Sequence, residues 1–556
     1  MRVARCLATK TYKIQPDFAA IGTKSLDHDP GLLGRNLNVK LLVKDPGGGL
    51  RYPSPMKTHS TQPGRLLTSI LSIAVIVGVT GAAPASPHPK KMKPWRIVVN
   101  DDGDVELPKD GPDLQKFLDV RFSATVGTQV DAYFLNIGST DRLWDKDKAR
   151  SQDAMSQWAE YGEVPEHVDR GIRRYIDAAH DAGMQIYFAM RLNDIHDSWA
   201  PELTYPLKAQ RPDLLLGRKG MAAGAALLEK HWSGFDWSQQ VVRDHFRDFI
   251  LWAAARWDFD GVELDWFRHP MFFKPGEEQA NVEKMTDFVR QVRRGLNAVG
   301  RKRDRPCRLT TRVPDTPHLA LLTGFDVEQW LKEGLLDMLM VGGGYMPYGG
   351  RLQQFIDMAH RYGVHAYPCM NHYKEPEQMR SVAAGFWALG ADGFYLFNYG
   401  GVKDSDPRRR CLDEIGDPAA LVGLDKRFVA DTGCSINYVG HTNPPSQFPR
   451  RIVGSHPVEL VVGDDLAGGP SVRATLFVKV TEVPEDESIA IRVNGRQLPA
   501  DRVARPDEST FHIDVPPGFF TRGINHVQVA PGPGSLGDFA SAVTAMELVV
   551  DYDPVK

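Results

Sequence analysis

The feature that most constrains this chain is a regular alternation of short apolar runs and longer amphipathic stretches between Trp95 and Gly401. The short runs are rich in β-branched and aromatic residues, which is typical of strands, and the longer stretches have the apolar spacing of helices. The eight candidate strands are Trp95–Asp101, Asp131–Gly138, Met184–Asp194, Gly261–Arg268, Cys307–Pro314, Leu336–Tyr345, Val364–His372 and Gly393–Gly400. Eight strand and helix units predict a closed (β/α)8 TIM barrel. An open doubly wound sheet is the alternative, but no GxGxxG phosphate loop follows the first strand.

The periodicity changes after the barrel. Short alternating runs separated by Gly, Pro and Asp turns extend from about His456 to Tyr552, and this pattern predicts a β-sandwich. We therefore expect an α/β chain with a barrel over residues 90–440 and a β-sandwich accessory domain over 446–556. The accessory domain is expected either to pack as a spacer or to bind carbohydrate.

The one strongly apolar segment is Arg65–Ser86, with a basic start, an apolar core and the small-residue sequence Ala83–Pro84–Ala85. It predicts a signal peptide over residues 56–85 rather than a membrane anchor, because its core is too short to span a bilayer comfortably. Met56 is then the expected start of translation, and residues 1–55 are an upstream leader to which we assign no fold. The chain is expected to be exported, to the periplasm or the extracellular space.

Composition limits the partners. The formal net charge is −3 and the sequence pI is near 6.6, without a basic stripe that would favour nucleic acid or an anionic membrane surface. We predict no cofactor, and the sequence does not indicate an oligomeric state. Cys307 and Cys369 fall in predicted strands and are expected to be buried, whereas Cys411 and Cys434 are candidates for a disulfide.

Polar residues gather at the ends of the predicted strands, which form the mouth of a barrel and hold its active site. Asp194 ends the third strand, and Glu263 and Asp265 lie in the fourth. These three carboxylates are the candidate catalytic residues. Candidate substrate-binding residues at the same mouth are Arg191, Asn193, Arg268, His269, Arg312, Tyr345, Asn371, His372 and Asn398. Asp315 follows Arg312 at the end of the fifth strand.

The fourth strand explains where its carboxylates point. Strand alternation sends Glu263, Asp265 and Phe267 to one face and Val262, Leu264 and Trp266 to the other. The second set is apolar and faces the helices, so the carboxylates must point into the barrel, where burial without a partner is costly. Arg191 and Arg312 on the flanking strands are their expected partners. A purely structural ion network with these arginines is the alternative interpretation.

A long insertion follows the third strand and contains Trp199, Tyr205, Trp232 and Trp237. Its aromatic residues are expected either to stack on sugar rings or to form the hydrophobic core of the loop. The run Asn193–Trp199 contains residue types that bind metals, but it lacks a recognised ligand spacing, and we predict no metal site from it.

The stretch Asp260–Phe267, DGVELDWF, resembles the DGxDxDxE strand of family 18 glycoside hydrolases, although Phe267 stands where the acid glutamate of that family would be. A closer resemblance is to the glycosyl hydrolase-like 10 group of exported bacterial barrels, on Asp260, Gly261, Asp265, Arg268 and Pro270 and on the segment Phe325–Leu339. The resemblance covers the barrel and implies a glycan substrate and hydrolysis of glycosidic bonds.

Glycoside hydrolysis needs two carboxyl groups, one to donate a proton and one to act as nucleophile or base. Asp265 is the expected first group, and Glu263 or Asp194 the second. Glu263 and Asp265 should have Cα atoms about 6.6 Å apart, a spacing that leaves retention and inversion both open. The alternatives are a barrel that binds glycan without cleaving it, which the loss of an acid at Phe267 favours, and, more weakly, a polysaccharide lyase.

Overall fold

The structure is a computed structural model of the 556-residue chain. It describes residues 92–101, 114–136, 164, 166–199, 201, 204–220, 231–267, 269–342, 350–370, 375–399, 406–430, 446–453, 456–467, 472–485, 487–535 and 541–552. The predicted signal peptide and upstream leader lie outside these ranges. No helix among the described residues is long and apolar enough to cross a membrane.

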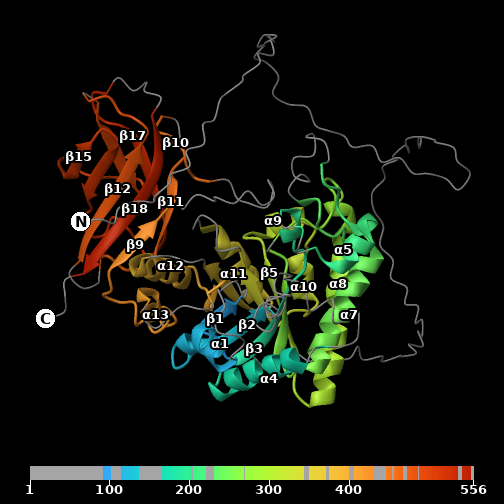
Figure 1. The fold of residues 1–556 in the computed structure, drawn as a ribbon. Coiled ribbons are helices and arrows are strands. Elements are labelled where there is room, and N and C mark those ends of the chain that lie inside the picture. Colours follow the sequence, from blue (N-terminus) through green and yellow to red (C-terminus); the bar gives the residue numbers. More distant parts are fainter. Residues whose placement is uncertain are drawn as a thin grey trace, which may run out of the picture. The chain divides into compact units, whose positions relative to one another are not determined.

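Eight parallel strands close into a barrel in chain order, and β1 pairs with β8 to complete it. The strands are β1 (Ile97–Asp101), β2 (Val130–Asn136), β3 (Gln185–Arg191), β4 (Gly261–Asp265), β5 (Arg308–Val313), β6 (Met338–Val341), β7 (His365–Met370) and β8 (Phe394–Leu396). Each observed strand overlaps one of the eight predicted strands, so the predicted TIM barrel is confirmed (Figure 1).

Helices cover the outer face of the barrel strands. The α-helices are α1 (Leu114–Arg121), α4 (Glu166–Asp181), α5 (Pro206–Gln210), α7 (Gln240–Arg256), α8 (Glu278–Arg303), α9 (Pro317–Leu322), α10 (Val327–Lys332), α11 (Gln353–Arg361), α12 (Pro376–Ala388) and α13 (Pro407–Cys411). Short 3-10 turns are η1 (Ser123–Thr125), η3 (His196–Ser198), η5 (Pro212–Leu214), η7 (Gly350–Leu352) and η8 (Ala500–Arg502). In α7, Val242, Phe246, Phe249 and Ala253 recur at helical spacing and are buried, which is why this segment folds as a helix against the sheet.

The two faces of β4 separate as the alternation predicts. Val262, Leu264 and Trp266 belong to the large core between strands and helices, while Glu263 and Asp265 lie inside the barrel. The floor of the interior is aromatic: Phe134 stacks on Tyr187 at 4.7 Å, and Trp95 meets the edge of Tyr187 at 5.3 Å. A glycine is required at Gly261, because a Cβ there would lie 2.3 Å from the Tyr187 ring.

The C-terminal residues form two antiparallel sheets, as predicted for a β-sandwich domain. One sheet has the order β10-β18-β12-β16-β15, with β9 paired to β18, and the other has the order β11-β17-β13-β14. Their strands are β9 (Lys426–Val429), β10 (Arg450–Arg451), β11 (Val458–Val462), β12 (Val472–Val480), β13 (Ile489–Val493), β14 (Arg496–Gln497), β15 (Val503–Asp507), β16 (Thr510–Asp514), β17 (Gly523–Pro531) and β18 (Ala542–Tyr552). Strands β9 and β10 precede the range His456–Tyr552 from which the domain was predicted.

Helix α12 joins the barrel to these sheets. The Ser381 hydroxyl on α12 donates a hydrogen bond of 2.5 Å to the carbonyl of Arg427 on β9. Gly463, just after β11, lies so close to α12 that a Cβ there would be 2.2 Å from the carbonyl carbon of Ala384. The barrel and the C-terminal sheets therefore share a packed contact through α12.

Both cysteines that were predicted to be buried are buried, Cys307 at 1% and Cys369 at 4% exposure. Cys411 is also buried, and Cys434, its proposed partner, lies outside the described residues.

Candidate active site at the barrel mouth

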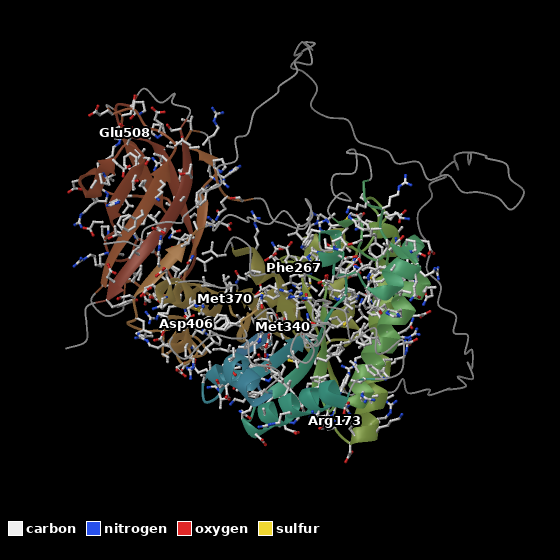
Figure 2. The ribbon with its side chains drawn as sticks, in the orientation of Figure 1. Arg173, Phe267, Met340, Met370, Asp406 and Glu508 are labelled. Carbon is white, nitrogen blue, oxygen red and sulfur yellow. The ribbon has the colours of Figure 1, made fainter. Side chains whose placement is uncertain are left out.

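Three charged residues stand side by side on neighbouring strands inside the barrel. Asp265 at the end of β4 is the register partner of Arg191 on β3 and of Arg312 on β5. Strand register therefore places a carboxylate between two guanidinium groups at the carboxyl ends of the strands, and all three side chains are buried. Phe267, which follows β4 and is labelled in Figure 2, is buried as well.

Arg312 donates a hydrogen bond to each of the two carboxylate oxygens of Asp265. Nε of Arg312 donates to Oδ1 at 2.9 Å and its terminal nitrogen donates to Oδ2 at 2.8 Å. The backbone N–H of Phe267 donates to Oδ1 at 3.0 Å. Both oxygens of Asp265 thus accept, which is the bonding pattern of an ionised carboxylate.

The same arginine also contacts an aromatic ring. Its guanidinium carbon lies 4.1 Å from the centre of the Phe397 ring, a cation–π contact. Burial lowers the pKa of Arg312, but the adjacent Asp265 charge outweighs burial and raises the pKa well above its usual value. Arg312 therefore stays charged and fixes the orientation of Asp265.

Glu263 lies two residues deeper in the barrel than Asp265, opposite Ala189 and Thr310 on the flanking strands. Its Oε2 accepts a hydrogen bond of 2.9 Å from the Tyr395 hydroxyl. Burial, and then the charge of Glu263, raise the pKa of Tyr395 well above its usual value, so the phenol keeps the proton that it donates. Glu263 is fully buried.

Asp315 is a second carboxyl group at the mouth, two residues beyond β5. It is buried, with 4% of its surface exposed. Burial raises the pKa of Asp315 to about 7, against smaller opposing effects from its own backbone N–H and from Arg351 and Arg312. Its Oδ2 has no hydrogen-bond partner among the described residues. Such a carboxyl holds a proton near neutral pH and is able to donate it.

Asp194 follows β3 and forms a separate cluster with two histidines. Its carboxylate lies 2.7 and 2.8 Å from Nδ1 of His196 and accepts the His196 backbone N–H at 2.9 Å. His269, from the segment after β4, completes the group, and a terminal nitrogen of Arg191 is 3.6 Å from Asp194 Oδ2. Burial alone would raise the pKa of Asp194, but the His196 hydrogen bond and the charges of both histidines and Arg191 hold it well below its usual range.

Asn193 is engaged with the backbone of two loops. Its side-chain nitrogen donates to the carbonyl of Met271 at 2.5 Å and its oxygen accepts from the N–H of Phe235 at 2.8 Å. The side chain is 2% exposed. Its observed contacts tie the loop after β3 to the insertion and to the loop after β4.

Asn398 lies half-buried just after β8 in the left-handed backbone region, with φ of 52°. Its backbone N–H donates to the Asn100 side chain at 3.2 Å. The remaining predicted binding residues, Arg268, Tyr345, Asn371 and His372, lie outside the described residues.

Some aromatic residues of the insertion form the hydrophobic core of the loop, and one is exposed so that it could stack on a sugar ring. Tyr205 and Trp237 are buried in the loop core, at 1% and 0% exposure, and Trp232 is half-buried. Trp199 is 61% exposed, and its ring centre lies 5.1 Å from that of His196 and 6.2 Å from that of His269. Trp199 is therefore an accessible aromatic surface beside the Asp194 cluster.

Two of these features were not assigned a role from sequence. Asp315 was recognised only as a strand-end residue, and His196 was one letter in a run without ligand spacing. A position just beyond a barrel strand was the available signal for Asp315. No local pattern could join His196 to His269, because the two lie on different loops.

Comparison with known proteins adds the following. No family model matches the chain, and no curated protein matches it. Similar solved structures include alpha-L-fucosidase isoenzyme 2 from Paenibacillus thiaminolyticus, with 14% identity, a TM-score of 0.36 and 59% of this chain covered. The match covers 49% of the fucosidase, so the chain spans about half of its length.

Two further structures match over nearly their whole length. The PgaB (BpsB) glycoside hydrolase domain from Bordetella bronchiseptica has 13% identity and a TM-score of 0.36, with 58% of this chain and 99% of that domain covered. An Anoxybacillus alpha-amylase has 12% identity and a TM-score of 0.32, with 80% of this chain and 100% of the amylase covered. At such identities and TM-scores, function has to be inferred from the side chains at the barrel mouth.

Proposed function

We propose that this chain is a glycoside hydrolase that cleaves O-glycosidic bonds in an oligosaccharide or polysaccharide. The observation that carries the proposal is the presence of two unlike carboxyl groups, one at the end of β4 and one just beyond the adjacent strand β5. Asp265 accepts through both oxygens, as an ionised carboxylate does, and burial raises the pKa of Asp315 to about 7. One ionised and one protonated carboxyl group are what glycoside hydrolysis requires.

In the proposed reaction Asp315 gives its proton to the leaving glycosidic oxygen as the bond to the anomeric carbon breaks. Asp265 either attacks the anomeric carbon directly or removes a proton from the water that attacks it. If Asp265 attacks, water then displaces it from the anomeric carbon while Asp315 removes a proton from that water and is restored as the acid. If Asp265 acts as the base, the proton that it takes from water returns to Asp315 by exchange with solvent. Arg312 orients Asp265 throughout.

The other candidate carboxylates fit less directly. Glu263 lies deeper and is bonded to Tyr395, and Asp194 is occupied by His196. We propose a structural role for Glu263, as the hydrogen-bond partner of Tyr395 in the barrel interior below Asp265. Substrate binding is proposed for Arg191, Asn398 and Trp199, together with the predicted residues Arg268, Tyr345, Asn371 and His372.

A glycan-binding barrel without turnover is the second candidate. The observation that favours it is the complete pairing of Asp265, whose two oxygens are both engaged and whose surface is 2% exposed. A nucleophile or base must give up part of this pairing during the reaction, whereas a structural ion pair need not.

A panel of polysaccharides with reducing-end detection tests these two functions on the full chain. We expect release of reducing ends from at least one glycan, with turnover lost in Asp265→Asn and in Asp315→Asn. Glu263→Gln tests the deeper carboxylate. Asp357→Asn, at an exposed position on α11, is the matched control and should retain activity. The anomeric proton signal of the first product, followed by NMR, distinguishes retention from inversion.

Glycan affinity without release of reducing ends by the intact chain would instead establish the binding function. Unchanged turnover in both Asp265→Asn and Asp315→Asn would move the chemistry away from this pair.

We also propose that the chain is exported, on the basis of the signal-peptide pattern at residues 56–85. Cell fractionation followed by N-terminal sequencing should find a mature protein that begins near Ser86 in the periplasm or the medium. An intact N-terminus in the cytoplasmic fraction would exclude export.

A further inference from the structure

We propose that Asp194, His196 and His269 bind one divalent transition-metal ion, with Zn²⁺ as the best match. This inference is independent of the proposed function, because it follows from the geometry of the three side chains alone. Each residue offers one ligand atom, and the three atoms all lie within 4.8 Å of one another.

The donor set selects the class of metal. Two imidazole nitrogens and one carboxylate oxygen are the usual ligands of Zn²⁺ and its first-row neighbours. Ca²⁺ and Mg²⁺ prefer oxygen ligands, and Mg²⁺ demands an octahedral arrangement, so this set does not suit them. To coordinate the ion, each histidine must be neutral and offer a ring nitrogen that carries no proton.

The loop that carries Asp194 and His196 is anchored by hydrogen bonds from buried side chains. The Lys208 ammonium donates to the backbone carbonyl of Asp194 at 2.6 Å and to the Asp197 carboxylate at 3.0 Å. The Ser233 hydroxyl donates to the same Asp197 oxygen at 2.8 Å. Lys208, Asp197 and Ser233 are all buried, so the network holds two of the proposed ligands in place before an ion arrives.

The third ligand is tied to the first two through Asn193. This residue precedes Asp194, and its side chain donates to the carbonyl of Met271, which is two residues beyond His269. The N–H of Met271 in turn donates to the His269 carbonyl at 2.7 Å. Asn193 therefore fixes the separation of the two ligand loops, as groups outside the coordination sphere do in metal sites.

Three protein ligands leave a coordination position open, the arrangement of zinc sites that bind water or substrate. The side chain of His196 is 16% exposed, and the exposed Trp199 ring stands beside both histidines. An ion here is reachable from solvent next to a flat apolar surface.

The nearby charges tune the affinity. Arg191 lies 3.6 Å from Asp194, and a guanidinium so close to a cation weakens its binding. Coordination by nitrogen is therefore needed to hold the ion, which again favours Zn²⁺, Ni²⁺ or Co²⁺ over Mn²⁺.

The test is a titration of the full chain, stripped with a chelator, with Zn²⁺ by calorimetry and with Co²⁺ by visible absorption. We expect one ion per chain, and we expect the visible absorption bands of bound Co²⁺ to be those of an ion with a low coordination number. His269→Ala, His196→Ala and Asp194→Asn should each weaken binding by at least about 100-fold, beyond the 10- to 100-fold loss typical of groups outside the coordination sphere. His318→Ala, at an exposed position on α9, should bind like the parent chain.

Circular dichroism establishes that each variant is folded before it is titrated. A parent chain that takes up no stoichiometric Zn²⁺ or Co²⁺ would overturn the inference, as would equal affinity in folded His269→Ala and the parent. Glycan cleavage by the parent chain is measured separately: cleavage without stoichiometric metal binding rejects this inference alone, and metal binding without cleavage rejects the proposed function alone.

Discussion

Asp265 and Arg312 face each other across adjacent strands of the barrel and share two hydrogen bonds, of 2.9 and 2.8 Å. Arg312 is 0% exposed and Asp265 is 2% exposed. A buried ion pair of this kind costs much to break from one side, because the remaining charge is left without compensation.

Arg312→Met should therefore lower the free energy of unfolding by about 3–5 kcal/mol, measured by urea denaturation. The double variant Arg312→Met with Asp265→Asn should lose less than the sum of the two single changes, because it leaves no uncompensated charge. Arg211→Met is the control, since Arg211 pairs with Asp213 at the surface and its loss should leave the stability almost unchanged. Equal losses in Arg312→Met and Arg211→Met would contradict a buried pair.

The raised pKa of Asp315 predicts a dependence of stability on pH. The folded chain keeps the carboxyl protonated up to about pH 7, whereas the unfolded chain ionises near its usual value of 3.8. The stability that this group contributes is thus complete below about pH 4 and is lost as the pH rises to 7. The loss amounts to up to about 4 kcal/mol.

Unfolding measured from pH 4 to pH 8 checks this prediction against Asp315→Asn, which cannot ionise. The free energy of unfolding of the parent should fall relative to that of the variant across this range. Parallel curves for the two proteins would mean that Asp315 titrates at its ordinary pKa.

The same group should set the alkaline limb of the pH–rate profile if it is the proton donor. We expect kcat/KM to decline above about pH 7 and Asp315→Asn to lower it by about 10²- to 10⁴-fold, the range for general acid catalysis. A glycoside with a good leaving group needs little protonation and should rescue much of the loss. Persistence of the alkaline limb in Asp315→Asn would assign it to another residue.

Tyr395 and Glu263 provide a test of the deeper interior. Tyr395→Phe removes a hydroxyl that donates to Glu263 at 2.9 Å in a fully buried setting, and should cost about 1–3 kcal/mol of stability. Tyr362→Phe removes an exposed hydroxyl bonded to Glu328 and should change the stability much less. Thermal or urea unfolding of the two variants makes the comparison, and an equal cost would show that burial of the pair is unimportant.

The contact between the barrel and the C-terminal sheets makes a prediction at Gly463. An added methyl group would meet the backbone of Ala384 on α12, and backbone cannot move aside as a flexible side chain does. Gly463→Ala should therefore destabilise the chain by about 1–3 kcal/mol, measured by chemical denaturation. Val422→Ala, at a position 67% exposed, should stay within about 0.5 kcal/mol of the parent.

The barrel was predictable because its signals are local. Each strand is a short β-branched or aromatic run, and the alternation along Gly261–Asp265 was sufficient to assign Glu263 and Asp265 to the interior. The pairing of Asp265 with Arg312 followed from the same reasoning, since register partners at the ends of adjacent strands must lie together.

The properties of the candidate site that were not predictable arise from tertiary contacts. The residues near Asp315 in the sequence do not predict its burial. The burial depends on residues from other parts of the barrel, among them Gly342 after β6. The approach of His269 to Asp194 and His196 likewise depends on Asn193, whose hydrogen bonds reach residues far along the chain. Spacing within one segment cannot encode either relationship.

The stacked rings of Phe134 and Tyr187, with Trp95 against them, close the end of the barrel opposite Asp265. Because these rings block the barrel axis, no compound can pass from one end of the barrel to the other. A compound that reaches Asp265 must enter and leave through the mouth at the carboxyl ends of the strands. A long polymer would then have to lie across the rim or insert only its tip, and a fragment left in the barrel would have to leave before the next chain end could enter.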